Sequence, residues 1–315
     1  MKKLHLQKSN FWGAVHLASG LPTSYSDFRD YMRCKYNPTD EFADILPENE
    51  FRGNITVYDE EKCGRFLYHL INNSCTADNW SDFENSLANL DFHYALENWC
   101  IGKVIKNEEI DGTLPEMSNW NKIRNLDLFY FNLEKVVDYL HDSFSDWIET
   151  IDLNKGHAIP IFNEIIDDDC KFLTFNYTST LENIYDIQSS RICHIHCFNE
   201  NFIFGHGDQT NHQRVYNESN NESKAAEVFN KITDSLRKNT RCYLNHHDNF
   251  FRNLSNVTEI YSYGFSFSDV DLPYIRRICE VVDTRNARWY QYRYNGSDYR
   301  EIIEGCGFEG SIENW

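Results

Sequence analysis

Apolar and polar positions alternate along much of the chain in a way that predicts strands followed by helices. The apolar runs Phe172–Tyr177 and Val257–Tyr263 are rich in aromatic and β-branched residues. Such runs are typical of buried strands in a parallel sheet. Small polar turns and then helical spacing follow each run, which predicts an α/β fold. The same criteria predict strands over Ile192–Phe198, Asn201–Phe204 and Ala287–Tyr294, and helices over Ala225–Arg252 and Leu272–Asp283.

Residues 35–170 have a different pattern. Tyrosine and tryptophan are frequent there, glycine is sparse, and apolar side chains recur every three or four residues. This spacing is typical of amphipathic helices. It predicts helices over Cys63–Ile71, around Trp80–Leu90 and over Leu126–Ile151. We interpret the stretch as a large helical insertion domain.

The outer parts of the chain are predicted to form one domain around a parallel sheet flanked by helices. Phe11–Leu17 has the character of a first strand, and a helix begins at Ser24–Asp27 after a loop of small residues. Strand, loop and helix in this order form the first phosphate-binding turn of nucleotide-binding folds. Because GxGxxG is absent, a simple turn is the alternative. We assign residues 1–34 and 171–315 to a Rossmann-like nucleotide-binding domain.

Charge and cysteine content narrow the class of protein. The formal net charge is −19, from 30 basic and 49 acidic side chains. A chain with this negative charge repels the phosphate backbone of nucleic acids, and we therefore expect no direct nucleic-acid partner. The ten cysteines include no CxxC pair, and no apolar stretch approaches the ~18–20 residues of a membrane span. We expect a cytoplasmic protein with reduced thiols that does not enter a membrane.

Candidate chemistry gathers at the ends of two predicted strands. Asn176 lies where a strand turns into a helix, and a neutral amide both donates and accepts hydrogen bonds. His196 can accept a proton near neutral pH. Strand alternation places His194 and His196 on one face. The alternatives are that Asn176 caps the next helix and that His196 is a hydrogen-bonded strand histidine.

Other polar residues allow both a functional and a structural interpretation. The same alternation sends Cys193 and Cys197 to the face opposite the histidines, so we expect no metal site there. His206 lies in a glycine-flanked turn that serves either a ligand or the loop itself. Asp271 either accepts hydrogen bonds from ribose hydroxyls or caps the following helix. Arg29 either pairs with a pyrophosphate or lies on the surface.

Four motifs together resemble the abortive-infection protein H (AbiH) family of bacterial anti-phage defence proteins. In the order of the family, they are GLPTSYSDF (Gly20–Phe28), TFNYTSTLENIY (Thr174–Tyr185), HIHC with FGHG (between His194 and Gly207) and YGFSFSDVDLPY (Tyr263–Tyr274). The core of that family in turn resembles the sirtuin fold, a Rossmann-like NAD-binding domain. Thr174-Phe175-Asn176 stands at the Thr-Gln-Asn of sirtuins and His196 at the histidine of their His-Gly motif.

The resemblance implies roles for individual residues. It implies that Asn176 and His196 are catalytic and that NAD is the substrate. It also implies contacts with the nucleotide from a further set of residues. These cofactor-binding residues are Gly13, Ala14, Gly20, Arg29, Thr174, His206, Gly264, Ser266 and Asp271.

Two functional hypotheses follow from the resemblance. The first is an abortive-infection effector that hydrolyses NAD to nicotinamide and ADP-ribose. The second is a non-catalytic nucleotide-sensing or partner-binding module, because the first loop has Trp12 and His16 where the family usually has glycine and aspartate. A nuclease fits less well, since no cluster of carboxylates stands out. Expected partners are NAD or a related nucleotide, a second defence protein or phage trigger, and a further copy of the chain.

Overall fold

The computed structural model describes residues 2–7, 20–38, 46–47, 50–52, 55–92, 94–95, 119–198, 201–207, 220–292 and 298–314. The chain divides into two compact units, each built from segments that are distant in sequence. The first unit comprises Met1–Asp27, Ile148–Gly207 and Lys238–Trp315, and the second comprises Phe28–Trp147 and Asp208–Arg237. The division follows from how densely the residues pack within each unit and carries no information on ligands. The assignment of nucleotide binding to one domain therefore stays a prediction.

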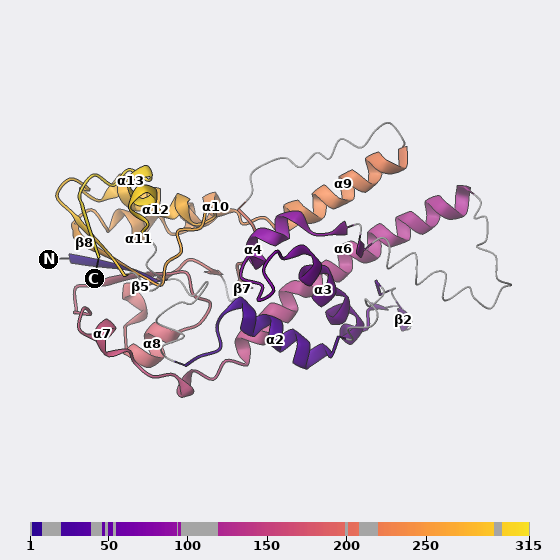
Figure 1. Ribbon diagram of the computed structural model, residues 1–315, viewed down its shortest axis with the longest axis horizontal. Helices are drawn as coiled ribbons and strands as arrows, with labels where there is room; N and C mark the ends of the chain where they lie inside the picture. Colours follow the sequence, from indigo (N-terminus) through magenta and orange to yellow (C-terminus); the bar gives the residue numbers. More distant parts are fainter. Residues whose placement is uncertain are drawn as a thin grey trace. The chain divides into compact units, whose positions relative to one another are not determined.

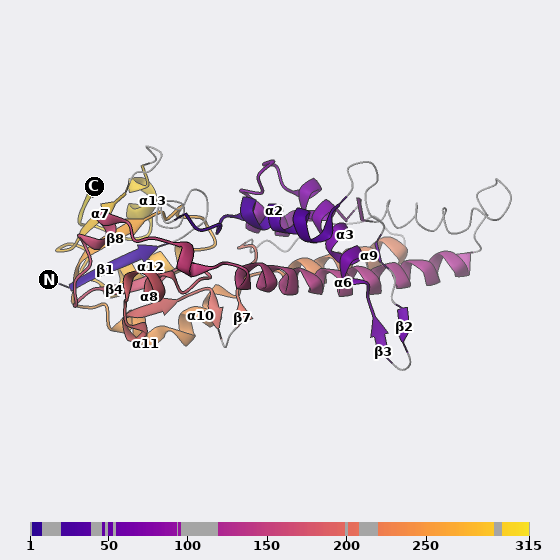
Figure 2. The same ribbon diagram turned by 90° about the horizontal axis from the view of Figure 1, so that it is seen from below.

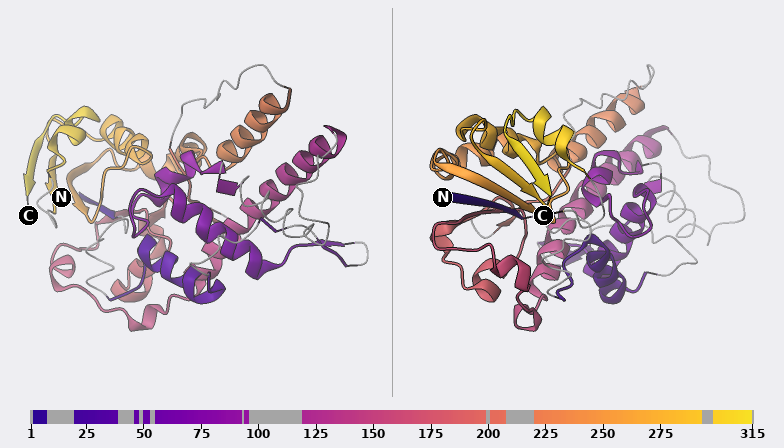
Figure 3. Two further views of the ribbon diagram at one scale, coloured as in Figure 1. Left: turned by 45° about the vertical axis from the view of Figure 1, so that its right-hand side comes forward. Right: turned by 60° about the vertical axis from the view of Figure 1, so that its left-hand side comes forward.

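The first unit is built around a sheet of six parallel strands (Figure 1). Its strands are β1 (Lys2–Gln7), β4 (Lys171–Thr174), β5 (Ile192–His194), β8 (Val257–Tyr263), β9 (Arg288–Gln291) and β10 (Ser311–Asn314). They lie in the order β10-β9-β8-β1-β4-β5, side by side in the right-hand view of Figure 3. The chain proceeds outward from β1 through β4 to β5, returns beside β1 at β8, and proceeds outward again. This is the strand order of a Rossmann-like fold, which confirms the predicted fold class.

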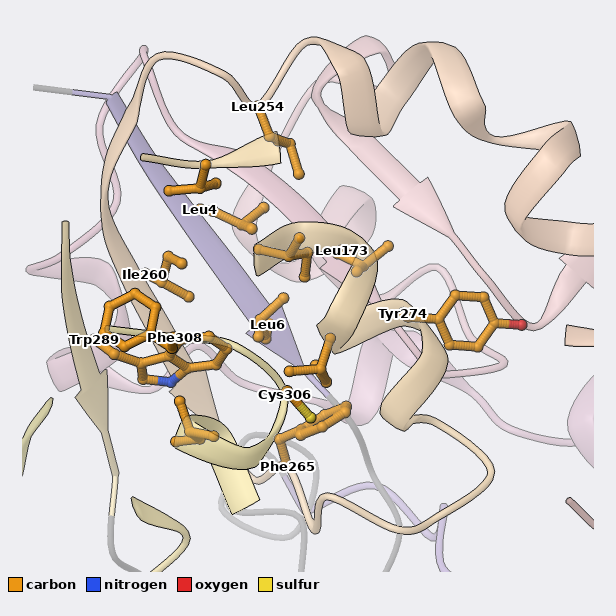
Figure 4. Close-up of a cluster of buried hydrophobic side chains, with 14 of the residues drawn as sticks. Leu4, Leu6, Leu173, Leu254, Ile260, Phe265, Tyr274, Trp289, Cys306 and Phe308 are labelled. Atoms are coloured by element: carbon orange, nitrogen blue, oxygen red, sulfur yellow. The ribbon is translucent and has the colours of Figure 1, made fainter. Parts of the chain in front are cut away.

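One face of the sheet is covered by three helices, α11 (Asp248–Arg252), α12 (Leu272–Val281) and α13 (Arg300–Gly305). Alternation along β1 sends Leu4 and Leu6 to this face, and Ile260 and Trp289 join them from β8 and β9 (Figure 4). Tyr274 of α12 lies at the margin of this cluster, with its hydroxyl directed away from it.

The opposite face is covered by α7 (Pro160–Asn163) and α8 (Thr180–Tyr185), which pack on Phe172 and Tyr263. His5 of β1 is buried on this face. Its ring stacks on Phe172 and Tyr261 of the two neighbouring strands, at centroid distances of 5.1 and 5.0 Å. Burial lowers the pKa of His5 to about 3, so the imidazole is neutral in the folded protein. The sheet is therefore the middle layer of three.

The second unit is mainly helical. It contains most of α2 (Tyr25–Tyr36) and α6 (Asn119–Glu149), together with α3 (Glu60–Ser74), α4 (Phe83–Ser86), η1 (Leu87–Asn89) and α9 (Asn220–Ser235). Phe28 is fully buried and lies edge-on to Trp80, Phe83 and Phe144. The hairpin of β2 (Glu50–Arg52) and β3 (Ile55–Val57) projects away from the long helix α6 (Figure 2).

Several predicted elements agree with the structure. The strand Val257–Tyr263 has the predicted bounds, and helices occupy each of the three stretches predicted in the insertion. The predicted helix over Ala225–Arg252 is instead three helices, α9, α10 (Thr240–His246) and α11. The strand predicted over Phe11–Leu17 lies outside the described residues. The first described strand is β1, which the pattern did not predict, and neither did it predict β10.

The predicted strand Ile192–Phe198 is wrong as a single element. It follows the short turn η3 (Ser189–Arg191), and β5 ends at His194. The chain turns at Ile195 and His196, and β6 (Cys197–Phe198) pairs antiparallel with β7 (Asn201–Phe202) in a separate sheet. The remaining short element is η2 (Leu153–Lys155). Among the described residues, no helix combines the length and apolar character needed to cross a membrane.

Candidate functional site

The candidate site lies at the carboxyl edge of the sheet, next to the place where the strand order reverses. Gln7 of β1 pairs in register with Thr174 of β4 on one side and with Tyr263 of β8 on the other. These three strands therefore end at the same level. Asn176 follows β4 and Gly264 follows β8 within two residues. Open α/β sheets bind their ligands at this edge.

The Asn176 side chain is held inside the protein. Thr174 at the end of β4 accepts a hydrogen bond from the Asn176 backbone N–H through its Oγ1, at 3.1 Å, and this fixes the turn. The Asn176 side chain is only 1% exposed. Within the described ranges, neither Oδ1 nor Nδ2 of its amide has a hydrogen-bond partner. Asn176 therefore does not cap α8, and among the described residues no group satisfies its buried amide.

His196 is positioned by the residues on either side of Asn176. The Tyr177 ring stacks on the imidazole at 5.2 Å, and the Phe175 ring meets it edge-on at 5.5 Å. The backbone carbonyl of His196 accepts a hydrogen bond from Ile203 N at 2.8 Å, which closes the β6–β7 hairpin. Only 1% of His196 is exposed.

The prediction that His194 and His196 share a face is wrong. Because β5 ends at His194, the alternation does not extend to His196. His194 is instead hydrogen-bonded to Glu182 of α8, with 2.8 Å between Nε2 and Oε1. Burial acts to raise the pKa of Glu182, but the hydrogen bond from His194, the charge of His194 and a backbone hydrogen bond together outweigh it, so the pKa is lowered. His194 thus belongs to a partly exposed pair and not to the site.

Two further charged residues lie against His196. Asp271, immediately before α12, is fully buried and has its Oδ1 3.7 Å from His196 Nε2. Its Oδ2 accepts a 2.7 Å hydrogen bond from Ser268, and its side chain does not cap α12. On the other side, Lys238 Nζ lies 3.2 Å from His196 Nε2. Lys238 is 2% exposed, and its backbone N–H donates to the His206 carbonyl at 3.0 Å.

The other predicted contacts are placed as follows. His206 is buried and joins the cluster through Lys238. Gly264 has a φ of +63°, a conformation that favours glycine, and Ser266 is half-buried two residues later. The structure therefore brings Thr174, Asn176, His196, His206 and Asp271 to one edge of the sheet, with Gly264 and Ser266 in the turn that follows β8.

Two other predicted contacts have neighbours outside this cluster. Arg29 belongs to the second unit, where its guanidinium pairs with Asp30 and donates to the Asp78 carbonyl. Gly20 has a φ of +77° and lies beside His157. Gly13 and Ala14 lie outside the described residues.

The two cysteines near the site, Cys193 and Cys197, are buried or half-buried thiols. Burial raises the pKa of Cys193 to about 12 and that of Cys197 to about 11, so neither is a thiolate near neutral pH. Cys193 packs in the core with Leu4 and Leu173. In the part of the chain that the structure describes, no group of three or more His, Cys, Asp or Glu side chains is placed to hold a metal ion.

Sequence reasoning missed Lys238. The residue follows the polar helix α9 in the stretch Asp234–Asn239, where charged residues are typical of a solvated helix end. No local pattern distinguishes it from an exposed lysine. Its burial depends on contacts with His196 and His206, more than 30 residues earlier in the chain.

Comparison with known protein families identifies the family of the chain. The model of the family described as bacteriophage abortive infection AbiH matches residues 16–293. No curated protein and no solved structure matches the chain.

Proposed function

The chain belongs to the bacteriophage abortive infection AbiH family, and on this premise we propose that it acts in phage defence by hydrolysing NAD to nicotinamide and ADP-ribose. Consumption of NAD would deprive an infected cell of its main redox carrier. The match supports the role in abortive infection, and the geometry of the site supports the choice of reaction.

The single observation that carries the proposal is the state of Asn176. Its amide is buried at the carboxyl edge of a Rossmann-like sheet and, among the described residues, both of its polar atoms are without a partner. Leaving a buried polar group unsatisfied costs about 1–3 kcal/mol. A ligand that offers both a donor and an acceptor, such as the ribose of a nucleotide, would recover that free energy.

The reaction breaks the bond between nicotinamide and the ribose. Water adds to the ribose carbon, nicotinamide leaves with the bonding electrons, and one proton is released. The transition state resembles an oxocarbenium ion, so the site must hold the ribose and the water in fixed positions. In our proposal Asn176 orients the ribose or the water, and His196 accepts the proton. Thr174 and the rings of Phe175 and Tyr177 hold these two residues in place.

The second candidate function is a nucleotide-sensing or partner-binding module that does not catalyse. The observation that favours it is the first loop, where Trp12 and His16 stand in place of the usual glycine and aspartate. A bulky tryptophan prevents close approach of the backbone to a phosphate.

The test compares variants in an assay for NAD consumption. Purified protein is incubated with NAD, with and without lysate of phage-infected cells, and NAD, nicotinamide and ADP-ribose are separated by chromatography. Asn176→Ala and His196→Ala should each reduce the rate roughly 10²–10⁴-fold. Cys193→Ala is the control, because Cys193 lies in the core and not at the site.

Two results separate the candidate functions. NAD that remains intact under every condition, while calorimetry still detects nucleotide binding, would support the sensing module. Hydrolysis that survives both Asn176→Ala and His196→Ala in folded protein would contradict the assignment of the site.

A further inference from the structure

Strands β8, β9 and β10 lie side by side at one end of the sheet and present an accessible face (Figure 3). Trp289 and Ile312 point into the cluster that α12 and α13 cover, so their neighbours along each strand point to the opposite face. On that face, α7 and α8 pack around Phe172 of β4 and Tyr263 at the end of β8. The side chains beyond them are exposed or half-buried, and we call this set the open face. It consists of Glu259, Tyr261, Arg288, Tyr290, Ser311 and Glu313.

The open face is unusual for a sheet of this kind. Sheets whose strands are all parallel are ordinarily covered on both faces. Here the half-buried rings of Tyr261 and Tyr290 stack on each other at 4.8 Å, and Tyr261 also stacks on the buried ring of His5 at 5.0 Å. A row of aromatic rings therefore continues from the core to the surface. Tyrosine and arginine are enriched where proteins contact one another, and the open face combines both.

The strand register arranges the open face in two rows that run across the strands. The first row is Glu259, Arg288 and Ser311, and the second is Tyr261, Tyr290 and Glu313. The rows are two residues apart along each strand, because side chains on one face alternate with those on the other. Each row thus contains one carboxylate, and the single guanidinium lies in the first row.

Two copies of this face are complementary when their rows are exchanged. A two-fold axis that runs across the strands, between the two rows, places the first row of each copy over the second row of the other. Arg288 then lies over the Tyr290 ring and beside the Glu313 carboxylate of the second copy, which allows a cation–π contact and an ion pair. The Ser311 hydroxyl can donate to the same carboxylate. An axis along the strands would instead place Arg288 over its own copy and is unfavourable.

We propose that the open face is a homodimer interface, in which it packs on the open face of a second copy with the rows exchanged. Every contact then occurs twice, as in any interface of two-fold symmetry. The two sheets pack face to face, so the parallel sheet is covered on both sides. Because the net charge of −19 opposes association of two copies, the local pairing of Arg288 with Glu313 is essential to this interface. The proposal does not depend on hydrolysis of NAD.

The test measures the association of the full-length protein by sedimentation equilibrium over a range of concentrations. The unaltered protein should form a dimer that dissociates on dilution. Arg288→Glu should weaken the dimer at least about tenfold, because it places a carboxylate beside Glu313 of the second copy at two symmetric positions. Glu313→Arg should weaken it similarly by placing two guanidiniums together. Both side chains are exposed, so both variants should fold, and circular dichroism checks this.

A mixture of the two variants separates this interface from other modes of association. Arg288→Glu has carboxylates at both positions, whereas Glu313→Arg has guanidiniums at both. A dimer with one copy of each variant therefore has an attractive pair at both symmetric positions. The mixture should associate at concentrations at which each variant alone is monomeric.

The matched control is Arg241→Glu. Arg241 is an exposed residue of α10, which packs on α11 and α12 and not on the open face. This variant makes the same change in net charge and should still form the dimer. An unaltered protein that is monomeric at every concentration would overturn the proposal, and so would a dimer that Arg288→Glu weakens no more than Arg241→Glu. A mixture of the two variants that associates no better than either alone would also overturn it.

Discussion

Replacing His5 with phenylalanine should make the stability of the first unit less sensitive to acid. His5 lies in the central strand β1, is 1% exposed, and stacks between Phe172 and Tyr261. A phenylalanine ring keeps this stacking but cannot be protonated. It also loses the contact between His5 Nε2 and Cys170 Sγ, which are 3.3 Å apart, and that loss is the same at every pH.

The magnitude follows from the pKa of His5 in the two states. Burial, and then the positive charge of Lys3, lower it from 6.5 to about 3 in the folded protein. The unfolded chain therefore binds a proton at His5 as the pH falls below 6.5, while the folded protein does not until about pH 3. The free energy of unfolding is therefore unaffected by His5 above pH 6.5, the pKa in the unfolded chain. It falls as the pH is lowered from 6.5 towards about 3, the pKa in the folded protein. At pH 5 the loss due to His5 is about 2 kcal/mol, with a slope of about 1.4 kcal/mol per pH unit.

The assay is urea unfolding followed by circular dichroism at pH 7, 6 and 5. The free energy of unfolding of His5→Phe should decline less than that of the unaltered protein, by about 2 kcal/mol at pH 5 relative to pH 7. His157→Phe serves as the control, because it removes an exposed imidazole. An equal decline in His5→Phe and in the unaltered protein would refute the assignment of a buried neutral histidine to this position.

Two further predictions concern backbone geometry and a helix cap. Gly310→Ala should lower the melting temperature, because a Cβ there would collide with the backbone carbonyls of Ala287 and Thr284, at a cost of about 1–3 kcal/mol. The control is Gly305→Ala, which should leave the melting temperature unchanged because nothing lies within 4 Å of the added Cβ. Equal melting temperatures for the two variants would contradict this prediction. Asp59→Ala should destabilise the second unit by about 0.5–2 kcal/mol, since Asp59 caps α3 by accepting from Lys62 N at 3.0 Å. Asp59→Asn keeps the cap and should retain most of that stability in the same urea titration.

The sequence predicted those helices and strands whose hydrophobic pattern is complete within a short segment. The apolar run of β8 and the helical spacing of α3 and α6 are visible in any short window of sequence, and Asn176 was placed at the end of β4 for the same reason. The turn at Ile195 and His196 was missed because the alternation of His194, His196 and their neighbours continues through it. In β1, two lysines and a histidine occupy a six-residue strand, and the partners of its buried histidine lie far away in the sequence.

The residues around His196 also differ in whether the sequence near them indicates their position. Asp271 and His206 were candidates because each lies in a turn after a predicted strand. Lys238 was not, because its burial results from residues distant in sequence. A charged side chain on a polar stretch is ordinarily exposed, so only the tertiary structure distinguishes it.

The three-segment construction of the first unit has a consequence for the order in which the protein folds during synthesis. β1 is the central strand, yet its partners β4 and β8 begin at residues 171 and 257. The helical unit, whose main segment is Phe28–Trp147, leaves the ribosome long before the sheet can close. Contacts this distant in sequence form slowly. The edge that carries Asn176, His196, Lys238 and Asp271 is therefore assembled only after β8 and Asp271 have been translated, and a ribosome that stops earlier releases a chain without the site.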